Sequence, residues 1–288
     1  MRIGFVVALA VALGSAGDPA WAAAQQPDNR ADMDTHPRPF ETPNEVWMEE
    51  LTVLEIRDAI RDGKTTALIL TGGIEQNGPY LVTGKHNYVL EAVGEAVAHR
   101  LGNALVAPIV TIEPGDPETA SSPGGIRLSP ETFRAVLRDM ATSLKAQGFT
   151  NIVLFGDNGG NQTPMKEVAE ELNAKWGGRP ARVHFIEPYY RDDIWSCDFI
   201  KNDLGILQQP DVCSATRDLF HDDYHYSAIV ATTNPRRIRA DERTKTGLFS
   251  INGVSFAPLE QTLANGYRLI EYRTDITVRA IQEAITGS

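Results

Sequence analysis

Two short apolar runs, each followed at once by a glycine-rich polar loop, constrain most strongly what this chain can fold into. Residues 67–70 (ALIL) lead into TGGIEQNGPYLVTGKH, and residues 152–155 (IVLF) lead into GDNGGN. Such apolar runs are typical of strands that are buried on both faces of a parallel sheet. Because α/β proteins place reactive groups at the carboxyl edge of the sheet, the two loops are expected to converge if their strands are neighbours.

Helical and apolar segments alternate along the rest of the chain, which predicts a three-layer α/β/α fold with a mainly parallel sheet. Two helix starts carry a proline next to a capping residue, at Ser129-Pro130 and Thr163-Pro164. The expected order is a helix near 52–62, a strand at 66–71, a helix at 87–101, a strand at 105–111, a helix from 129 to 148, a strand at 152–155, a helix from 163 to 176, a strand at 182–186 and a long helix at 258–286.

The amino-terminal segment is typical of a secretory signal. Residues 1–24 have an early Arg, a short apolar stretch and a small-residue site, and the apolar stretch is too short for a membrane span. The sequence therefore predicts a signal peptide at 1–24, a flexible linker at 25–50 and one α/β domain at 51–288. A periplasmic or secreted location is expected, with no membrane contact after cleavage of the signal.

Charge and cysteine content narrow the classes of partner. The formal net charge is −11 and no basic stripe is visible, which argues against a nucleic-acid partner. The two cysteines, Cys197 and Cys213, are consistent with a disulfide in an oxidising compartment and equally with two reduced thiols. Residues 188–218 have a weak pattern and are consistent either with an excursion over the rim of a site or with an ordinary surface loop.

The two glycine-rich loops carry the residues that are best suited to chemistry. Glu75 follows a buried strand, where an unpaired carboxylate costs several kcal/mol, so it needs a cation or hydrogen-bond donors. His86 lies at the end of the same loop and is, like Glu75, a plausible metal ligand. Asp157 in the second loop is a candidate base or metal ligand, and its alternative role is to bond backbone amides of its own turn.

These motifs, in this order, resemble the creatininase (creatinine amidohydrolase) family. The family's first motif reads roughly G-x-x-E-x-H-G-P-H-L-P-x-x-T-D, against residues 72–86 here, and its second reads N-G-H-G-G-N, against residues 156–161. The similarity extends from about Thr52 to about Pro235. It implies the α/β/α fold, a small-molecule substrate, hydrolysis of a C–N bond and a homo-oligomer.

The resemblance also implies metal ligands, and these are altered here. Glu75 is kept, whereas Asn77 and Asn158 stand in place of histidines and His86 stands in place of an aspartate. An aspartate can bridge two ions, whereas a neutral imidazole offers one lone pair to one metal. The sequence therefore predicts at most one divalent ion, with zinc as the expected metal and an ion-free site as the alternative.

The third ligand of such an ion is expected in the segment FHDDYH, residues 220–225. His221 and Asp223 are the two candidates, depending on how this segment is matched to the family. The alternative is that the segment is a solvated acidic helix start, where aspartates are favoured by the helix dipole. With Glu75 and Asp157 as the catalytic groups, the residues expected to contact the substrate are Asn77, Tyr80, Asn158 and Asn161.

Three functions are compatible with these residues. The leading one is an exported metal-dependent amidohydrolase, in which a metal polarises the carbonyl group and a carboxylate takes a proton from water. The second is a binding protein that keeps the scaffold and has lost hydrolysis, as the altered ligands suggest. The third, an anion site at residues 156–161, ranks last because Asp157 places a negative charge in that loop.

Overall fold

The computed structural model describes residues 30–287 apart from 178–179, 192, 209–221 and 252. The chain divides into a small unit that ends at Phe40 and a large compact unit, Glu41–Ser288. The described part of the small unit holds α1 (Arg30–Thr35). The large unit begins about ten residues before position 51, since Val46 is buried and Trp47 forms a bridge with Val106. The last residues of the expected linker 25–50 therefore pack against the sheet of the large unit.

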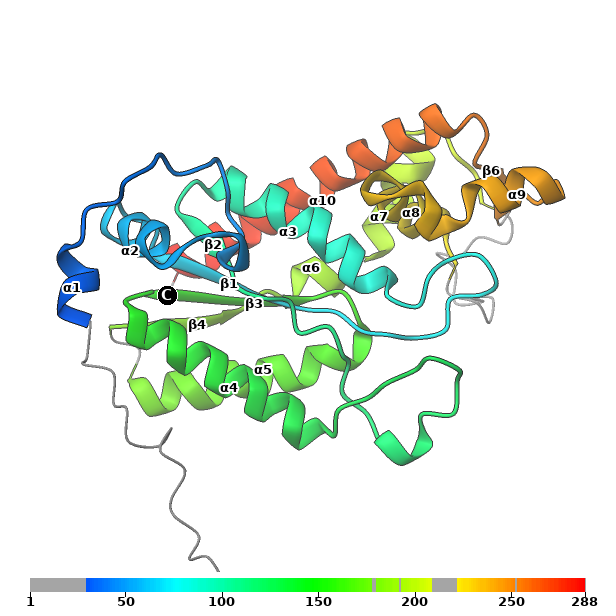
Figure 1. Cartoon of the computed structure of the whole chain (residues 1–288). Helices are drawn as coiled ribbons and strands as arrows, with labels where there is room; N and C mark the ends of the chain where they lie inside the picture. Colours follow the sequence, from blue (N-terminus) through cyan, green and yellow to red (C-terminus); the bar gives the residue numbers. More distant parts are fainter. Residues whose placement is uncertain (1–29, 178–179, 192, 209–221, 252, 288) are drawn as a thin grey trace, which may run out of the picture. The chain divides into compact units, whose positions relative to one another are not determined.

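The large unit is built on a four-stranded parallel sheet (Figure 1). Its strands are β1 (Thr66–Thr71), β2 (Ala104–Val106), β3 (Asn151–Gly156) and β4 (Arg182–Phe185), in the order β2-β1-β3-β4. Thr71 lies opposite Gly156 in the register of β1 and β3. Both glycine-rich loops therefore leave neighbouring strands at the same edge, which confirms the expected parallel arrangement.

One strand is shorter than the sequence predicts. The apolar run 105–111 forms only β2, which ends at Val106, and the chain then returns to β1 through a single bridge between Thr71 and Val110. Pro108 lies in the gap, and proline cannot donate a backbone hydrogen bond to a sheet. A run of apolar residues can thus include a proline, whereas the hydrogen bonds between two strands are interrupted there.

Helices cover both faces of the sheet, which confirms the three-layer fold. In Figure 1, α4 (Pro130–Gln147) and α5 (Gln162–Trp176) lie below the sheet, whereas α3 (Lys85–Leu101) and α10 (Leu259–Thr286) lie above it. Side chains of β1 alternate between the two layers. Leu68 and Leu70 join the core under α3 and α10, whereas Ala67 and Ile69 join the core against α4 and α5.

The helix starts and stops follow the sequence signals with one informative exception. Ser129 caps α4 by accepting a hydrogen bond from the Thr132 amide, and Gly148 ends the helix in the left-handed conformation at φ 109°. Helix α3, however, begins at Lys85 and not at residue 87. His86 therefore lies in the first turn of a helix, although the sequence indicated a loop position for it.

The chain after β4 is mostly helical. The segment 188–218, whose sequence pattern is weak, includes two helices. Residues 209–221, and Cys213 among them, lie outside the described part of the chain, as does the side chain of Cys197.

The remaining elements of the chain are α2 (Val53–Arg61), α6 (Pro188–Arg191), α7 (Asp193–Asn202), α8 (Tyr224–Thr233), α9 (Ala240–Thr246), β5 (Ser250–Ile251), β6 (Val254–Ser255) and 3-10 turns at Met48–Glu50, Pro117–Thr119, Gly159–Asn161 and Pro235–Ile238.

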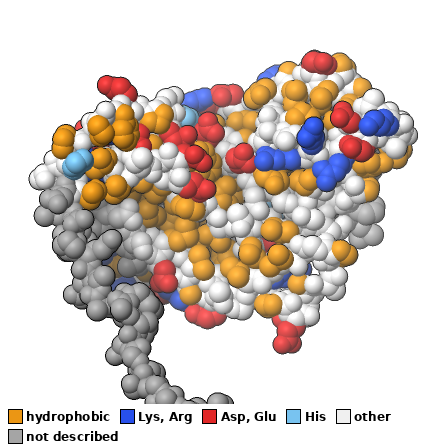
Figure 2. All heavy atoms as spheres, in the orientation of Figure 1, with side chains coloured by type: hydrophobic (Ala, Val, Ile, Leu, Met, Phe, Trp, Pro, Cys, Tyr) orange, Lys and Arg blue, Asp and Glu red, His pale blue; other side chains and the backbone are white. Residues whose placement is uncertain are grey.

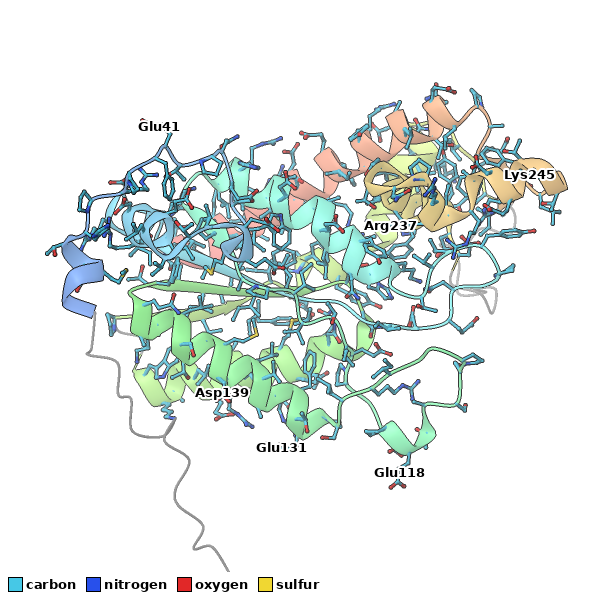
Figure 3. The ribbon with its side chains drawn as sticks, viewed as in Figure 1. Glu41, Glu118, Glu131, Asp139, Arg237 and Lys245 are labelled. Atoms are coloured by element: carbon cyan, nitrogen blue, oxygen red, sulfur yellow. The ribbon has the colours of Figure 1, made fainter. Side chains whose placement is uncertain are left out.

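Charge is unevenly distributed over the face of the molecule that Figure 2 shows. Figure 2 shows Lys and Arg side chains gathered at the upper right of the face in view, over the segment of α9 and the preceding 3-10 turn. Arg237 and Lys245 come from this segment (Figure 3). None of the helices in the described ranges has an apolar stretch long enough to cross a membrane.

Candidate functional site

The turn after β1 is shaped by two glycines that leave room for side chains from other elements. A Cβ atom on Gly72 would lie 1.9 Å from Asn87 Oδ1, and one on Gly73 would lie 2.8 Å from Glu113 Oε2. The space is used for hydrogen bonds, because the amide of Gly73 donates to Asn87 Oδ1 at 3.1 Å and that of Ile74 donates to Glu113 Oε2 at 2.6 Å. This close approach directs the chain toward the site and fixes the position of the next residue, Glu75.

His86 joins the two glycine-rich loops. Its Nδ1 lies 2.8 Å from Asp157 Oδ2, and its Nε2 lies 2.8 Å from Glu75 Oε1. The imidazole is buried and is also packed edge-on against the ring of Tyr226 from α8. The three residues that the sequence indicated as most reactive are therefore in one continuous chain of hydrogen bonds, in the order Glu75, His86, Asp157.

The two carboxylates change the protonation of this imidazole. Burial lowers the pKa of His86, but the hydrogen bonds with Asp157 and Glu75 outweigh it, so the pKa is raised above its usual value in spite of the nearby charge of Lys85. The protonated form is favoured because only an imidazolium can donate from both ring nitrogens. His86 consequently acts as a cation between two carboxylates.

Asp157 lies behind His86 and is fully buried. Its Oδ1 accepts a hydrogen bond from the Tyr189 hydroxyl at 2.9 Å and another from Arg273 Nη2 at 3.0 Å. The Arg273 guanidinium is itself 4.6 Å from the centre of the Tyr189 ring. These partners come from α6 and α10 and not from the turn of Asp157 itself. Asp157 therefore reaches a substrate only through His86, and a positioning role fits it better than that of a direct base.

Glu75 is the member of the group that reaches solvent, with 22% of its side chain exposed. Lys85 Nζ lies 3.2 Å from Glu75 Oε1, and Asn158 Nδ2 donates to Glu75 Oε2 at 3.3 Å. The Lys85 side chain is only 2% exposed, and its ammonium lies 4.7 Å from the centre of the Tyr226 ring. We call Glu75, Lys85, His86, Asp157 and Arg273 the carboxylate–histidine network.

Two of the asparagines expected to contact a substrate are used to hold the loops. The buried Asn77 donates from Nδ2 to the carbonyls of residues 75, 82 and 83, at 3.0 to 3.3 Å. The buried Asn161 donates to the carbonyls of Thr71 and Gly72 at 2.9 and 2.7 Å. Their side chains thus fix the backbone around the network. A contact between either side chain and a substrate stays a prediction.

Tyr80 lies in a different environment. Its ring packs against the guanidinium of Arg243, whose carbon is 4.6 Å from the ring centre. Arg243 in turn pairs with the buried Asp222 at 2.9 Å. A contact between Tyr80 and a substrate therefore stays a prediction.

The expected third metal ligand is not assigned by the structure. Asp223 is the residue immediately before α8, and His221 lies outside the described residues. Among the residues that the structure describes, no group of three His, Cys, Asp or Glu side chains could hold a metal ion. The metal role of Glu75 and His86 together with Asp223 or His221 therefore stays a prediction.

Sequence reasoning missed Lys85, Tyr189 and Arg273. Arg273 had a detectable signal, because it lies on the apolar stripe of α10 between the buried Leu269 and the buried Ile281. A charged residue on the buried face of an amphipathic helix needs a partner in the core. That partner, Asp157, is 116 residues away in the sequence, so nothing local identified it.

A small pocket opens beside the network. It has a volume of about 130 Å³, and Glu75, Gln76, Glu113, Ser122 and Arg127 contribute to its lining. This volume fits a molecule with few non-hydrogen atoms. The lining offers the carboxylates of Glu75 and Glu113 and the N–H donors of Arg127, a combination suited to a small polar substrate.

Comparison with known proteins places this chain in a family. The creatininase (creatinine amidohydrolase) profile matches residues 49–281. Among solved structures, a creatininase described as the Mn form has 20% identity and a TM-score of 0.56, with 84% of this chain and 98% of that chain covered. A mutant creatininase described as the Zn-Zn type has 19% identity and a TM-score of 0.56, with 85% and 98% covered.

A third similar structure comes from Bacteroides fragilis and is described as a putative creatinine amidohydrolase. It has 13% identity and a TM-score of 0.57, with 84% of this chain and 98% of that chain covered. No curated protein matches the sequence. At these identities the solved structures support the fold, and the profile, which spans most of the chain, supports the membership. The chain belongs to the creatininase (creatinine amidohydrolase) family.

Proposed function

We propose that this protein hydrolyses a C–N bond, in a cyclic amide or another amide, of a small molecule. The observation that carries the proposal is the position of Glu75. Its side chain lines a small pocket and is hydrogen-bonded to His86, which is in turn hydrogen-bonded to the buried Asp157. A partly exposed carboxylate with a fixed orientation is suited to move a proton to and from water. The family's description as amidohydrolases supports the same class of reaction.

In the proposed reaction Glu75 acts as the acid–base group. It takes a proton from a water molecule while the water oxygen bonds to the carbonyl carbon, and it then returns the proton to the departing nitrogen as the C–N bond breaks. The net result is addition of water, which yields a carboxylic acid and an amine. Arg127 lines the same pocket and supplies N–H donors for the carbonyl oxygen as it gains negative charge.

The other members of the network orient Glu75. His86 and Lys85 both contact Oε1, and Asn158 contacts Oε2. These three contacts hold the carboxylate in one rotamer, which reduces the entropy lost on reaching the reactive geometry. Asp157 stabilises the charge of His86 in turn, so its effect on Glu75 is indirect.

A divalent metal is the expectation from the fold, since similar structures are described as Mn and Zn-Zn forms. A bound metal would supply a polarised carbonyl and an activated water. The donors present here do not fit it, however, because both nitrogens of His86 already face carboxylate oxygens at 2.8 Å. Asn77 is also turned into its own loop. The proposed steps therefore use the side chains alone.

The test is a comparison of Glu75→Gln with the unaltered protein on a panel of five-membered cyclic amides and linear N-acyl amines, with amine release followed by NMR. The variant keeps the shape of the side chain and removes its ability to accept a proton, so turnover is expected to fall by about 100-fold or more. The control is Glu170→Gln, on the exposed face of α5, which should retain full activity.

Two results would count against the proposal. One is a Glu75→Gln variant that is as active as the control. The other is saturable binding of a panel member with no turnover by the unaltered protein, which would favour a binding protein on the same scaffold. Export through residues 1–24 and assembly into a homo-oligomer belong to the proposal as predictions, to be checked by cell fractionation and light scattering.

A further inference from the structure

Each carboxylate of the network is paired with a fixed cation. Lys85 Nζ lies 3.2 Å from Glu75 Oε1, and Arg273 Nη2 lies 3.0 Å from Asp157 Oδ1. The two cationic side chains are 2% and 1% exposed, respectively. Two carboxylates at one edge of a parallel sheet are the kind of donors that a divalent cation uses, but here side chains already neutralise both of them.

We infer that Lys85 and Arg273 take the place of a bound divalent ion. Lys85 neutralises Glu75 and Arg273 neutralises Asp157, so neither carboxylate needs a metal as its counter-ion. A divalent cation between these carboxylates would lie close to an ammonium and a guanidinium. Charge repulsion in a buried site is screened far less than in water, so the ion would have to displace at least one of these cations.

The surrounding side chains make such a displacement difficult. The Lys85 ammonium is confined in the first turn of α3, above the Tyr226 ring, and the Arg273 guanidinium lies against the Tyr189 ring. A cation that left its carboxylate would remain buried without that partner, which is strongly unfavourable. His86 fills the space between the two pairs and turns both of its nitrogens toward carboxylate oxygens.

The inference concerns ion content and not turnover, so it stands or falls separately from the proposed hydrolysis. The experiment is elemental analysis of the full chain after expression in medium supplemented with zinc and manganese. It is followed by calorimetric titration with Zn²⁺ and Mn²⁺ and by thermal unfolding with and without EDTA. The expected result is far less than one ion per chain, no saturable binding heat and no change of Tm with EDTA.

One tightly bound ion per chain, removed by EDTA with a fall in Tm, would overturn the inference. That result would instead favour the expectation from the sequence of one divalent ion per chain. A protein that holds no metal and still hydrolyses a panel member would support both proposals, whereas a metal-free inactive protein would support this inference and count against the hydrolysis.

A variant tests the role of the cation directly. Lys85→Met leaves Glu75 without its ammonium partner, so Zn²⁺ is expected to bind and raise the Tm of this variant. The matched control is Lys166→Met on the exposed face of α5, which should remain insensitive to Zn²⁺. If Lys85→Met folds and is as insensitive to Zn²⁺ as the control, Lys85 does not stand in for an ion. If it fails to fold, the ion content of the unaltered protein decides.

Discussion

Two ion networks in this molecule have nearly the same geometry and very different surroundings. The carboxylate–histidine network has contacts of 2.8 to 3.2 Å. The second network joins α4 to α5 on the surface, with contacts of 2.9 to 3.2 Å, and we call it the α4–α5 surface network. Its members are Glu131, Arg134, Arg138, Glu167 and Glu171.

Exposure is what separates them. Asp157 and Arg273 are 0% and 1% exposed, whereas the side chain of Glu131 is 68% exposed. Figure 3 shows Glu131 on the outer side of α4, away from the sheet. Water and salt screen the surface charges in both the folded and the unfolded state, so their pairing changes little on folding. The buried charges lose water on folding and depend on their partners. Contact distance alone therefore does not measure the importance of an ion pair.

The ion pair of Asp222 and Arg243 shows that a cationic partner does not always outweigh the effect of burial on the pKa of a carboxylate. Asp222 contacts Arg243 at 2.9 Å and accepts a hydrogen bond from Ser227 at 2.8 Å. Burial nevertheless raises the pKa of Asp222, and the lowering by Arg243 and Ser227 is smaller. This carboxylate is thus held less firmly in its charged form than its contacts suggest, and it provides an intermediate case for the comparison.

The largest effect is expected from Arg273→Met. The substitution keeps most of the buried volume and leaves Asp157 charged and fully buried with fewer partners, which should lower the free energy of unfolding by about 3–5 kcal/mol. Urea denaturation with constant m-value is the measurement. The control is Arg268→Met, an exposed position on the same helix that contacts the Asp203 carbonyl. Equal losses for both variants would show that burial does not distinguish them.

Breaking the intermediate pair with Arg243→Met should cost less, about 2–3 kcal/mol at neutral pH, because Asp222 can take up a proton more readily than a carboxylate of usual pKa. The loss relative to the unaltered protein should shrink as the pH falls, since a protonated Asp222 no longer needs a cation. Urea denaturation at several pH values checks this trend. A loss that stays constant down to acidic pH would contradict it.

His184 on β4 should make the free energy of unfolding depend on pH, and the main cause is burial of the imidazole and not an ion pair. Burial, and next the charge of Arg182, lower the pKa of His184 to about 4, and its Nε2 lies 3.2 Å from Asn151 Oδ1. A depressed pKa in the folded state means that the stabilisation is complete above the unfolded pKa of about 6.5 and is lost as the pH falls toward 4. Between pH 6.5 and 4.5 the loss should be about 2 kcal/mol.

The variant His184→Gln isolates this contribution. The difference in unfolding free energy between the variant and the unaltered protein should narrow as the pH falls from 6.5 to 4.5, because only the unaltered protein has an imidazole to protonate. Carboxylates titrate in both proteins and cancel in the difference. A difference that is independent of pH in this window would show that His184 is not held in its neutral form.

The smallest effect is expected from Arg138→Met in the α4–α5 surface network. Arg138 contacts Glu171 and Glu131, and hydrogen bonds with both raise its pKa, but the two carboxylates are 48% and 68% exposed. The Tm should match that of the unaltered protein within the error of calorimetry, in low and in high salt. A fall in Tm as large as that of Arg273→Met would erase the distinction between the two networks.

The sequence by itself determined the parts of the fold that depend on neighbouring residues. The apolar runs at 67–70 and 152–155 specified buried strands, and Ser129-Pro130 and Gly148 specified the two ends of α4. Because parallel strands present their carboxyl ends at one edge, the sequence also predicted that the loops with Glu75 and Asp157 would meet. These signals are short-range, so a single sequence contains them in full.

Only the tertiary structure decided which partners these residues have. The contacts of Asp157 with Tyr189 and Arg273 join residues that are 32 and 116 positions apart, and they depend on how α6 and α10 pack on the sheet. The start of α3 at Lys85 likewise placed a cation, which the sequence motif had left without a role, against Glu75. Side chains on separate elements meet only when the layers pack, and burial, which sets the strength of their charges, is a property of the packed layers and not of any local pattern.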